Sequence, residues 1–188
     1  RLNQAGPTLI VLAEHKPPVY DKAGVRLITS SVRRFPPDCL DPKIHSNNLV
    51  QSILAKIESN AAGADDALML DTHGFVAETN ATHVFLVCRD TVLTSRAVAC
   101  PEGITRETVL ELCGENGIAC RETDLSLTDV YRAEEMFCSG TMGELAAVVE
   151  VDGRPIGGGD ESAPGPMTRR LSELFAERTA VEGTRVVD

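Results

Sequence analysis

The stretch DTHGFVAETNATHVFLVC, residues 71–88, decides how the middle of this chain folds. Short apolar runs at 67–70 and 75–77 lie on either side of its first polar turn, and runs at 84–88 and 91–93 lie on either side of a second. Turn residues between short β-type runs favour tight connections between antiparallel strands. The sequence therefore predicts two hairpins in succession.

Upstream of this stretch, the pattern predicts two strands and a helix. β-type runs at 9–12 and 25–31 are separated by proline and glycine turn signals, which suggests two strands that meet through a loop. Residues 48–62 carry apolar side chains at the spacing of an amphipathic helix, and the glycine that follows is placed as its stop. We expect Ser46 or Asn47 to cap its start.

Downstream, helices alternate with short strands. The predicted elements are a helix at 105–115, a strand at 118–122, a short helix at 128–133, strands at 136–138 and 145–151, and a final helix at 167–180. The sequence contains neither an internal repeat nor an interior linker, so we predict one mixed domain.

The composition favours a globular enzyme that acts on small molecules. Of the 188 residues, 43% are hydrophobic and 24% are charged, which is enough apolar material for a core and too little charge for disorder. Acidic residues outnumber basic ones by 28 to 18, and no large Lys/Arg cluster is present, which argues against a nucleic-acid partner. No window of 18 uncharged apolar residues exists, so we expect no membrane span.

The cysteines and histidines show no metal or disulfide pattern. The six cysteines lie scattered without a C-x-x-C pair, so a disulfide framework is not expected and a reducing, cytoplasmic location is favoured. The four histidines lack the spacing of a zinc site, so no metal is predicted.

Four motifs together carry a resemblance to a known enzyme family. They are Asp41-Pro42-Lys43, the segment GFVAETN at 74–80, Gly103-Ile104-Thr105-Arg106, and SGTMGE at 139–144. Each is a weak signal alone. In this order, they resemble class IV pyridoxal-phosphate aminotransferases, the group of the branched-chain and D-amino-acid aminotransferases. The resemblance runs from about Val25 to Leu174.

The resemblance implies a fold and a division of the chain. The expected fold is the large domain of the fold-type IV pyridoxal-phosphate enzymes, an α+β (mixed α/β) unit whose strands curl into a barrel-like sheet with flanking helices. Residues 25–188 would form this domain, and residues 1–24 would be a remnant of the inter-domain segment and the first strand. The family's small N-terminal domain, of roughly a hundred residues, is expected to be absent from the chain.

The resemblance also implies an activity and partners. The expected reaction moves an amino group between an amino acid, branched-chain-like by the motifs, and a 2-oxo acid, with pyridoxal 5′-phosphate as cofactor. Family members build their active sites near a two-fold interface, so a homodimer is expected. Without the small domain, which carries the arginines for the substrate carboxylate, we expect the chain to hold cofactor weakly and to show little activity.

Lys43 is the expected catalytic lysine, which would form the Schiff base with the cofactor and shuttle the α-proton. In several family members, this lysine lies three residues before an asparagine, and counting back from Asn48 reaches His45 instead. In the branched-chain enzymes the interval is four, and counting back from Asn47 reaches Lys43. Because histidine cannot form an imine with the cofactor aldehyde, Lys43 is the choice.

The remaining cofactor contacts follow from the other three motifs. Glu78 would hold the protonated pyridine nitrogen of the cofactor, since a buried carboxylate without such a partner is costly. The phosphate would be bound by Ile104 and Thr105 at a helix N-terminus and by Gly140 and Thr141 in a glycine-containing turn.

Three further side chains receive secondary roles. Arg106 is expected to orient its loop or to pair with an acid. His83 stands where the family usually has asparagine and is expected to make a structural hydrogen bond. Arg34 could be structural or could face the mouth of the pocket.

Two other functions stay open on the sequence. Aminodeoxychorismate lyases resemble the same fold and share the cofactor apparatus, so elimination is an alternative to amino-group transfer. A binding or scaffold protein is the second alternative, in which His45 marks the loss of the Schiff-base lysine.

Overall fold

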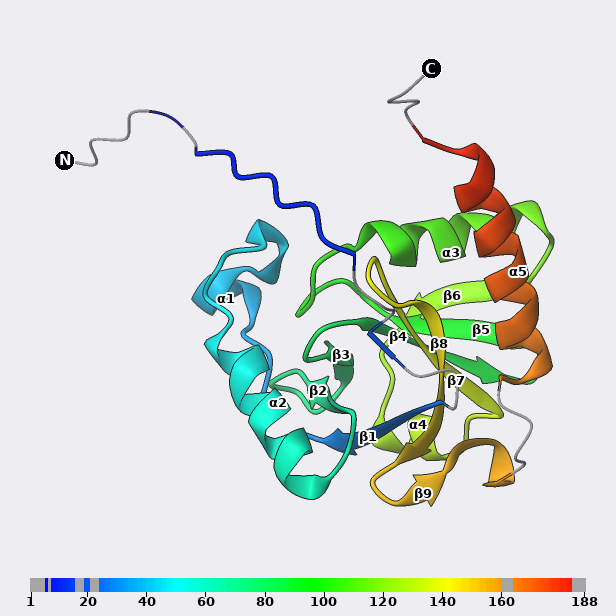
Figure 1. Cartoon of the computed structure of the whole chain (residues 1–188). Coiled ribbons are helices and arrows are strands. Elements are labelled where there is room, and N and C mark those ends of the chain that lie inside the picture. The colour runs from blue at the N-terminus through cyan, green and yellow to red at the C-terminus, as the bar shows by residue number, and fades with distance from the viewer. Residues whose placement is uncertain (1–5, 7, 16–18, 21–23, 160–163, 184–188) are drawn as a thin grey trace.

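The computed structural model describes residues 6, 8–15, 19–20, 24–159 and 164–183, and its centre is one strongly curled sheet (Figure 1). Its strands are β1 (Val25–Thr29), β2 (Asp66–Leu70), β3 (Val76–Thr79), β4 (His83–Cys88), β5 (Thr91–Ser95), β6 (Cys120–Thr123), β7 (Glu135–Gly140), β8 (Glu144–Val151) and β9 (Arg154–Pro155). Their order is β3-β2-β1-β8-β7-β4-β5-β6, and β9 pairs with β8.

The helices flank this sheet. They are α1 (Pro37–Leu40), the 3-10 turn η1 (Pro42–Ile44), α2 (Val50–Ala62), α3 (Ile104–Glu115), α4 (Leu127–Tyr131), the 3-10 segment η2 (Ile156–Gly159) and α5 (Pro166–Val181). Helices α3 and α5 lie side by side over one part of the sheet, whereas α2 packs on β2 at the other end (Figure 1). The predicted mixed α/β class is therefore confirmed.

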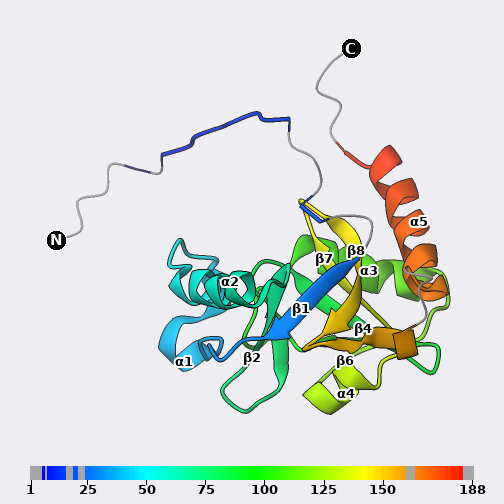
Figure 2. The same cartoon turned by 60° about the horizontal axis from the view of Figure 1, so that its bottom comes forward.

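The pairing of the strands confirms both predicted hairpins. Strands β2 and β3 are antiparallel, and so are β4 and β5. Strand β1 lies between β2 and β8 and is parallel to both (Figure 2). This arrangement brings the ends of β3, β4 and β7, which carry or adjoin the sequence motifs, to neighbouring positions.

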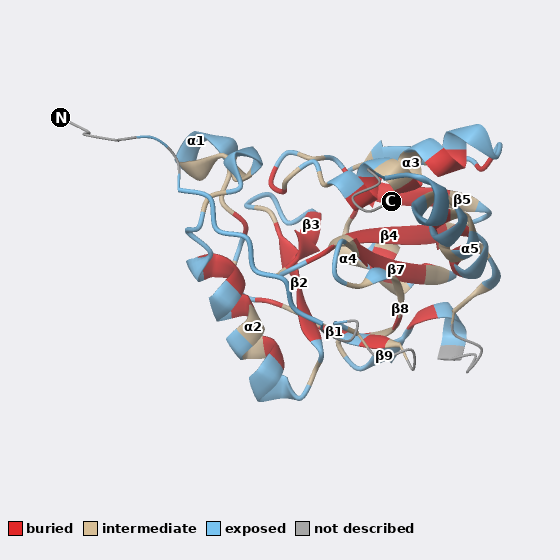
Figure 3. Cartoon of the chain, turned by 45° about the horizontal axis from the view of Figure 1, so that its top comes forward, coloured by how far each residue is buried: buried red, intermediate tan, exposed pale blue. Residues whose placement is uncertain are grey.

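The two larger of three apolar clusters lie against the sheet. The first is built from β1, β2, β4, β7 and β8 and is closed by α4, with Leu125 and Val130 fully buried. The second lies under α3 and α5 and contains Phe85, Phe137 and Leu171. The rings of Phe85 and Phe137 stack with centroids 4.9 Å apart. Figure 3 shows the strands buried beneath these helices.

Helix α4 begins with a capping box, which gives a test of the fold. The Ser126 side chain accepts a hydrogen bond from the backbone of Asp129, and the Asp129 carboxylate accepts one from the backbone of Ser126. We expect Ser126→Ala to lower the free energy of unfolding by about 1 kcal/mol, because the cap satisfies backbone groups at the helix start. Urea denaturation measures this, with Thr108→Ala on α3 as the control; an unchanged stability of Ser126→Ala would contradict the cap's role.

The predicted helix at 48–62 forms as α2, but its faces are reversed. Gly63 ends it as expected, with φ 71°. Its buried residues are Gln51, Ser52, Ala55 and Ser59, whereas the apolar residues that predicted the helix are about half exposed. The predicted cap is wrong, since the N-cap is Leu49 and no side chain caps it. The polar face turns inward because it meets the polar segment after β1.

The strand predicted at 9–12 is wrong. These residues are highly exposed and form no ladder, and β1 pairs with β2 and β8 instead. A β-type run needs a neighbouring strand to satisfy its backbone groups, and no described strand lies beside this one. Strand β1 itself, within the predicted run 25–31, is confirmed.

None of the described helices is both long and apolar enough to cross a membrane.

Candidate active site

A pocket of about 280 Å³ lies where three segments of the chain meet. The segment that contains η1 and the start of α2 forms one wall, the end of β3 forms another, and Pro101, in the loop before α3, lies at a third side. Glu78 and Arg34 both line the pocket. The fold thus places the predicted ring-nitrogen acid in a cavity.

Glu78 is a buried carboxylate with one cationic neighbour. It lies in β3 and is only 3% exposed. The Nη2 atom of Arg34 contacts its Oε1 atom as an ion pair. Burial raises the pKa of Glu78 to about 8, while the positive charge of Arg34 acts in the opposite direction. A second cation or N–H donor in the pocket would therefore stabilise the ionised carboxylate.

Arg34 is held in place by helix α2 and strand β3. Its guanidinium donates hydrogen bonds to Ser52 Oγ at 3.0 Å and to the Thr79 carbonyl at 3.2 Å. The neighbouring Phe35 N–H donates to Gln51 Oε1 at 2.9 Å. These contacts explain why the polar face of α2 is buried. Of the two roles open to Arg34, the structure shows it lining the pocket beside Glu78.

Three buried side-chain oxygens at this end of the sheet lack a hydrogen-bond partner among the described residues. They are Glu78 Oε1, which Arg34 contacts as an ion pair, Ser95 Oγ and Ser139 Oγ. Ser139 is paired directly with His83 across β7 and β4. A buried polar atom left unpaired costs about 1–3 kcal/mol. Glu78 fits the ring nitrogen of pyridoxal phosphate, which when protonated donates a hydrogen bond to a carboxylate, whereas the residues predicted to bind the phosphate lie outside the described pocket lining.

His83 lies between Glu78 and the loop that leads into α3. Its Nε2 atom is 2.8 Å from the Pro101 carbonyl oxygen and 3.8 Å from Glu78 Oε2. Burial lowers the pKa of His83, and the charges of Arg106 and Arg34 act in the same direction, although the bond to Pro101 opposes them. These effects favour the neutral ring, and the ring makes the structural hydrogen bond expected of it.

Helix α3 starts next to this histidine. Its N-cap is Gly103, with φ 74°, and no side chain caps the first turn, so backbone N–H groups there are open to a ligand. Thr105 is buried, whereas Ile104 is 83% exposed. Arg106 donates to the Ser95 carbonyl and pairs with Glu122, so it does pair with an acid.

The glycine-containing turn between β7 and β8 lies at the same end of the sheet. A Cβ on Gly140 would be 3.0 Å from Thr82 Cγ2, so the turn lies against the residue before His83. Thr141 is exposed. The described lining of the pocket does not include the four predicted phosphate residues, Ile104, Thr105, Gly140 and Thr141. They lie at the same end of the sheet and outside the lining.

Lys43 lies at the rim rather than inside. It is in η1, its side chain is 47% exposed, and its Nζ atom is 3.9 Å from Glu102 Oε1. The described pocket lining includes Pro42 and His45 but not Lys43. His45 has the left-handed backbone conformation, with φ 52°, which ends η1 and turns the chain toward α2. The structure thus brings His45, not Lys43, into the same pocket as Glu78.

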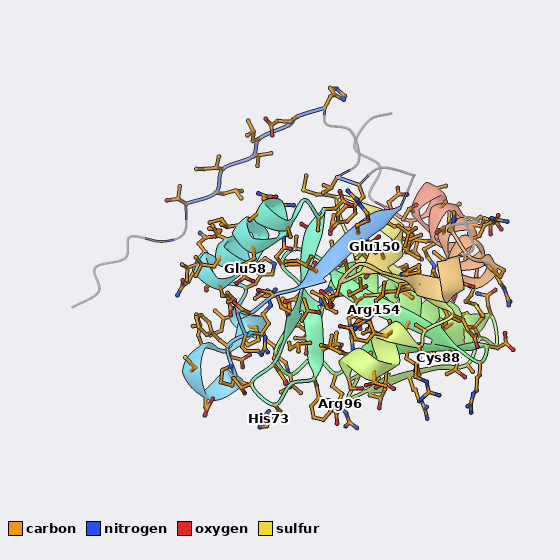
Figure 4. The ribbon with its side chains drawn as sticks, turned by 90° about the horizontal axis from the view of Figure 1, so that it is seen from below. Glu58, His73, Cys88, Arg96, Glu150 and Arg154 are labelled. Atoms are coloured by element: carbon orange, nitrogen blue, oxygen red, sulfur yellow. The ribbon has the colours of Figure 1, made fainter. Side chains whose placement is uncertain are left out.

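A second pocket of about 220 Å³ lies elsewhere, against the turn of the first hairpin. It is lined by His73 and Arg96, which Figure 4 shows at one edge of the molecule. Arg96 is engaged with Asp124 at 3.2 Å, and both side chains are more than half exposed. This surface pocket contains none of the predicted site residues.

The curled mixed sheet carries a buried acid in a pocket, close to a helix N-terminus that no side chain caps. The family model for class IV amino-transferases matches residues 2–151. The chain therefore belongs to the class IV aminotransferase family, as the motifs indicated.

Curated relatives carry the names of branched-chain enzymes. The chain is 51% identical over 185 residues to "Branched-chain-amino-acid aminotransferase-like protein 2" of Arabidopsis thaliana, a match that covers 98% of this chain and 33% of that protein. It is 37% identical over 153 residues to the branched-chain-amino-acid aminotransferase of Pseudomonas aeruginosa, covering 81% of this chain and 49% of the other. The chain thus spans between a third and a half of these two relatives.

Solved structures confirm the expected fold. The branched-chain aminotransferase of Thermoproteus uzoniensis, with norvaline, matches with a TM-score of 0.80 and 31% identity over 86% of this chain and 53% of that one. The branched-chain amino acid aminotransferase of Thermobaculum terrenum, in its PLP form, matches with a TM-score of 0.78 and 33% identity over 82% and 50%. The chain has the fold-type IV architecture of these enzymes.

Proposed function

We propose that this chain is the cofactor-binding part of a pyridoxal-phosphate-dependent transaminase that uses a branched-chain-like amino acid and a 2-oxo acid. The observation that carries the proposal is the buried Glu78 carboxylate, ion-paired with Arg34 and lining a pocket at the end of the sheet. Family membership and the named relatives support the reaction.

Different residues would bind the different parts of the cofactor. Glu78 would hold the ring nitrogen, and the start of α3, with Ile104 and Thr105, would bind the phosphate together with Gly140 and Thr141. When bound, pyridoxal phosphate supplies an aldehyde for the amino group and an electron-accepting ring. The protein would supply the buried Glu78 carboxylate, which keeps the ring nitrogen protonated. The segment that contains η1 and the start of α2 would limit the access of water to the pocket.

Lys43 is the proposed catalytic residue, which attaches the cofactor covalently and moves the α-proton. Lys56, the other described lysine, is engaged at 2.9 Å with the buried Asp66. Lys43 is held only by a contact with an exposed carboxylate, and it follows the pocket-lining Pro42. Rotation of its long side chain, which costs little, is needed to bring the amine inward.

A second candidate function rests on His45. Because His45 lines the pocket and Lys43 lies at its rim, the chain could bind pyridoxal phosphate without a covalent link, as a binding protein. The same ring-nitrogen and phosphate contacts serve both functions, and they differ in the fate of the cofactor aldehyde.

The test of the proposed function is a titration of the purified protein with pyridoxal phosphate, followed by an assay of 2-oxoglutarate conversion to glutamate with leucine as donor. We expect saturable binding with a visible absorption band, and amino-acid-dependent glutamate formation in a version that carries the domain for the substrate carboxylate. Absence of saturable binding would overturn the proposal. Pyruvate release from aminodeoxychorismate without glutamate formation would indicate the lyase.

We also propose that the protein is a homodimer and that α2 contributes to the interface. Val50, Ile53, Leu54 and Ile57 lie on one face of α2 at the i, i+3, i+4, i+7 spacing and are 47–57% exposed. A contiguous exposed apolar stripe indicates a contact surface, and closed two-fold pairs are the commonest oligomers.

Sedimentation tests this assembly. We expect a dimer for the protein at micromolar concentration and a monomer for Ile53→Asp/Ile57→Asp, because two carboxylates in an apolar interface have no partner. Val181→Asp, at an exposed position of α5, is the control and should leave the dimer intact. A monomeric wild type, or a dimeric double variant, would contradict the proposal.

A cytoplasmic location is proposed on the pattern of the cysteines. The six cysteines lie scattered in the sequence without a C-x-x-C pair, and none of them is in a disulfide in the structure. Scattered, unpaired cysteines are typical of proteins in a reducing compartment.

A further inference from the structure

We propose that His83 is a positioning residue that fixes the phosphate-binding start of α3 relative to Glu78. This inference rests on the proposed cofactor-binding function and deepens it. It assigns a role at the site to a side chain that contacts neither the proposed ring-nitrogen position nor the phosphate itself.

The first support is the hydrogen bond that His83 makes to the loop before α3. Its Nε2 atom is 2.8 Å from the Pro101 carbonyl oxygen, and a carbonyl can only accept, so Nε2 carries the proton. The side chain is 12% exposed, which strengthens a hydrogen bond because water competes poorly for it. One end of the loop is thereby tied to the first residue of β4.

The second support is the close packing of the ring against Gly103. A Cβ at Gly103 would lie 2.4 Å from Cε1 and 2.8 Å from Nδ1 of His83. The imidazole thus occupies the space that any larger N-cap residue would need. The backbone of Gly103, at the start of α3, packs directly against the imidazole of His83. The position of the start of α3 therefore depends on the position of that ring.

The third support is what lies on the other sides of the same residue. Glu78 Oε2 is 3.8 Å from Nε2, too long for a hydrogen bond but in direct proximity. Ser139, which precedes the glycine of the β7–β8 turn, pairs with His83 across the two strands. His83 therefore touches or adjoins all three segments that the cofactor would contact.

The charges around the ring favour its neutral form. Burial and the positive charges of Arg106 and Arg34 disfavour the imidazolium, and Glu78, whose pKa burial raises to about 8, is mostly protonated near neutral pH. The contact with the Pro101 carbonyl requires a proton on Nε2, and in the neutral ring this is the Nε2–H tautomer. The group acts as a geometric link rather than as a charge.

If His83 positions the start of α3, its replacement should weaken the binding of the phosphate group more than the binding of the pyridine ring. A misplacement of about 1 Å at a binding or reacting group can cost on the order of a hundredfold. If the start of α3 shifts relative to Glu78, the ring contact can survive while the phosphate contact weakens. The ratio of the dissociation constants for pyridoxal and pyridoxal 5′-phosphate isolates this effect, because the two compounds differ only in the phosphate.

The experiment compares two matched variants of the purified protein. His83→Gln places an amide nitrogen where Nε2 stands and keeps the donor to Pro101, whereas His83→Phe keeps a ring against Gly103 and removes the donor. Both dissociation constants are measured by absorbance titration, and thermal unfolding without cofactor is measured in parallel. We expect His83→Phe to reduce the preference for the phosphate compound about tenfold or more, and His83→Gln to keep it within about threefold of wild type.

The outcomes separate this inference from the function on which it rests. A wild type that binds neither compound overturns the proposed function. A wild type that prefers pyridoxal phosphate, together with a His83→Phe variant that keeps the full preference, overturns only the inference. A His83→Phe variant that loses both affinities equally as its unfolding temperature falls shows a merely structural role and also overturns it. If His83→Phe does not fold, His83→Leu replaces it with the same expected result.

Discussion

We expect Lys43→Ala to abolish covalent attachment of pyridoxal phosphate and, in a version that carries the domain for the substrate carboxylate, to reduce transamination below detection. An amine is needed to form a bond to the cofactor aldehyde, and of the lysines that the structure describes only Lys43 lies at the pocket without a buried partner. After borohydride reduction and proteolysis, mass spectrometry should find the cofactor on the peptide that contains Lys43. The variant should yield no such adduct and should lack the visible band.

The matched control is Lys43→Arg, which keeps the positive charge beside Glu102 but cannot form an imine. It should behave like Lys43→Ala in the adduct assay and like wild type in stability, because the contact with Glu102 is exposed and of little energetic value. An unchanged band in Lys43→Ala would sink the assignment. Saturable binding without any adduct in the wild type would instead support the candidate in which His45 faces the cofactor.

This experiment decides whether Lys43 or His45 occupies the position of the Schiff-base lysine, which counting along the sequence leaves open. Counting back from Asn47 or Asn48 gives Lys43 or His45, and the spacing alone supports both. In three dimensions the two residues differ: His45, which ends η1 in a left-handed conformation, lines the pocket, whereas Lys43, within η1, lies at the rim. A single left-handed residue rotates its neighbours' side chains relative to the helix that follows, and residue spacing does not encode that rotation.

The hairpins could be predicted because their information is local. Apolar runs and turn residues within 67–95 determine both the strands and their antiparallel pairing. The orientation of α2 could not be predicted, since its periodicity is real but its apolar side faces outward. What turns the polar side inward is a contact with Arg34 and Phe35, which precede the helix by a loop and a short helix.

The same distinction applies to the site. Glu78 can be proposed from the sequence because it ends an apolar strand within a motif. Its ion pair with Arg34 joins residues far apart in the sequence and depends on β1 and β3 lying on either side of β2. His83 was expected to make a structural hydrogen bond, but its contacts with Gly103 and Pro101 depend on a loop 18 residues downstream. When the fold brings a charged or hydrogen-bonding partner from a distant part of the chain, the sequence around either residue shows no pattern that predicts the contact.

Glu78→Gln should have opposite effects on stability and on cofactor binding. Without cofactor, the folded-state pKa of Glu78 is raised to about 8 from an ordinary value of 4.5, chiefly by burial. A raised pKa means that the stability contributed by the protonated form is fully present below about pH 4.5 and is lost as the pH rises through about 8. Glutamine has the shape of the protonated acid and does not titrate. The free energy of unfolding of the variant, relative to that of the wild type, should therefore rise across that pH interval, by at most about 1.4 kcal/mol per pH unit.

Cofactor binding should change in the other direction. The protonated ring nitrogen gives the ionised Glu78 a charge-assisted hydrogen bond, a contact worth about 1.5–3 kcal/mol. Its loss in Glu78→Gln should weaken pyridoxal phosphate binding roughly 10-fold to 150-fold at pH 8, where the unliganded variant is the more stable protein. Urea denaturation from pH 4.5 to 8.5 and absorbance titration at pH 8 measure the two effects, with Glu177→Gln on the exposed side of α5 as control. Equal cofactor affinity in wild type and variant would remove Glu78 from the ring-nitrogen role, and parallel stability curves would show that its carboxylate does not titrate between those pH values.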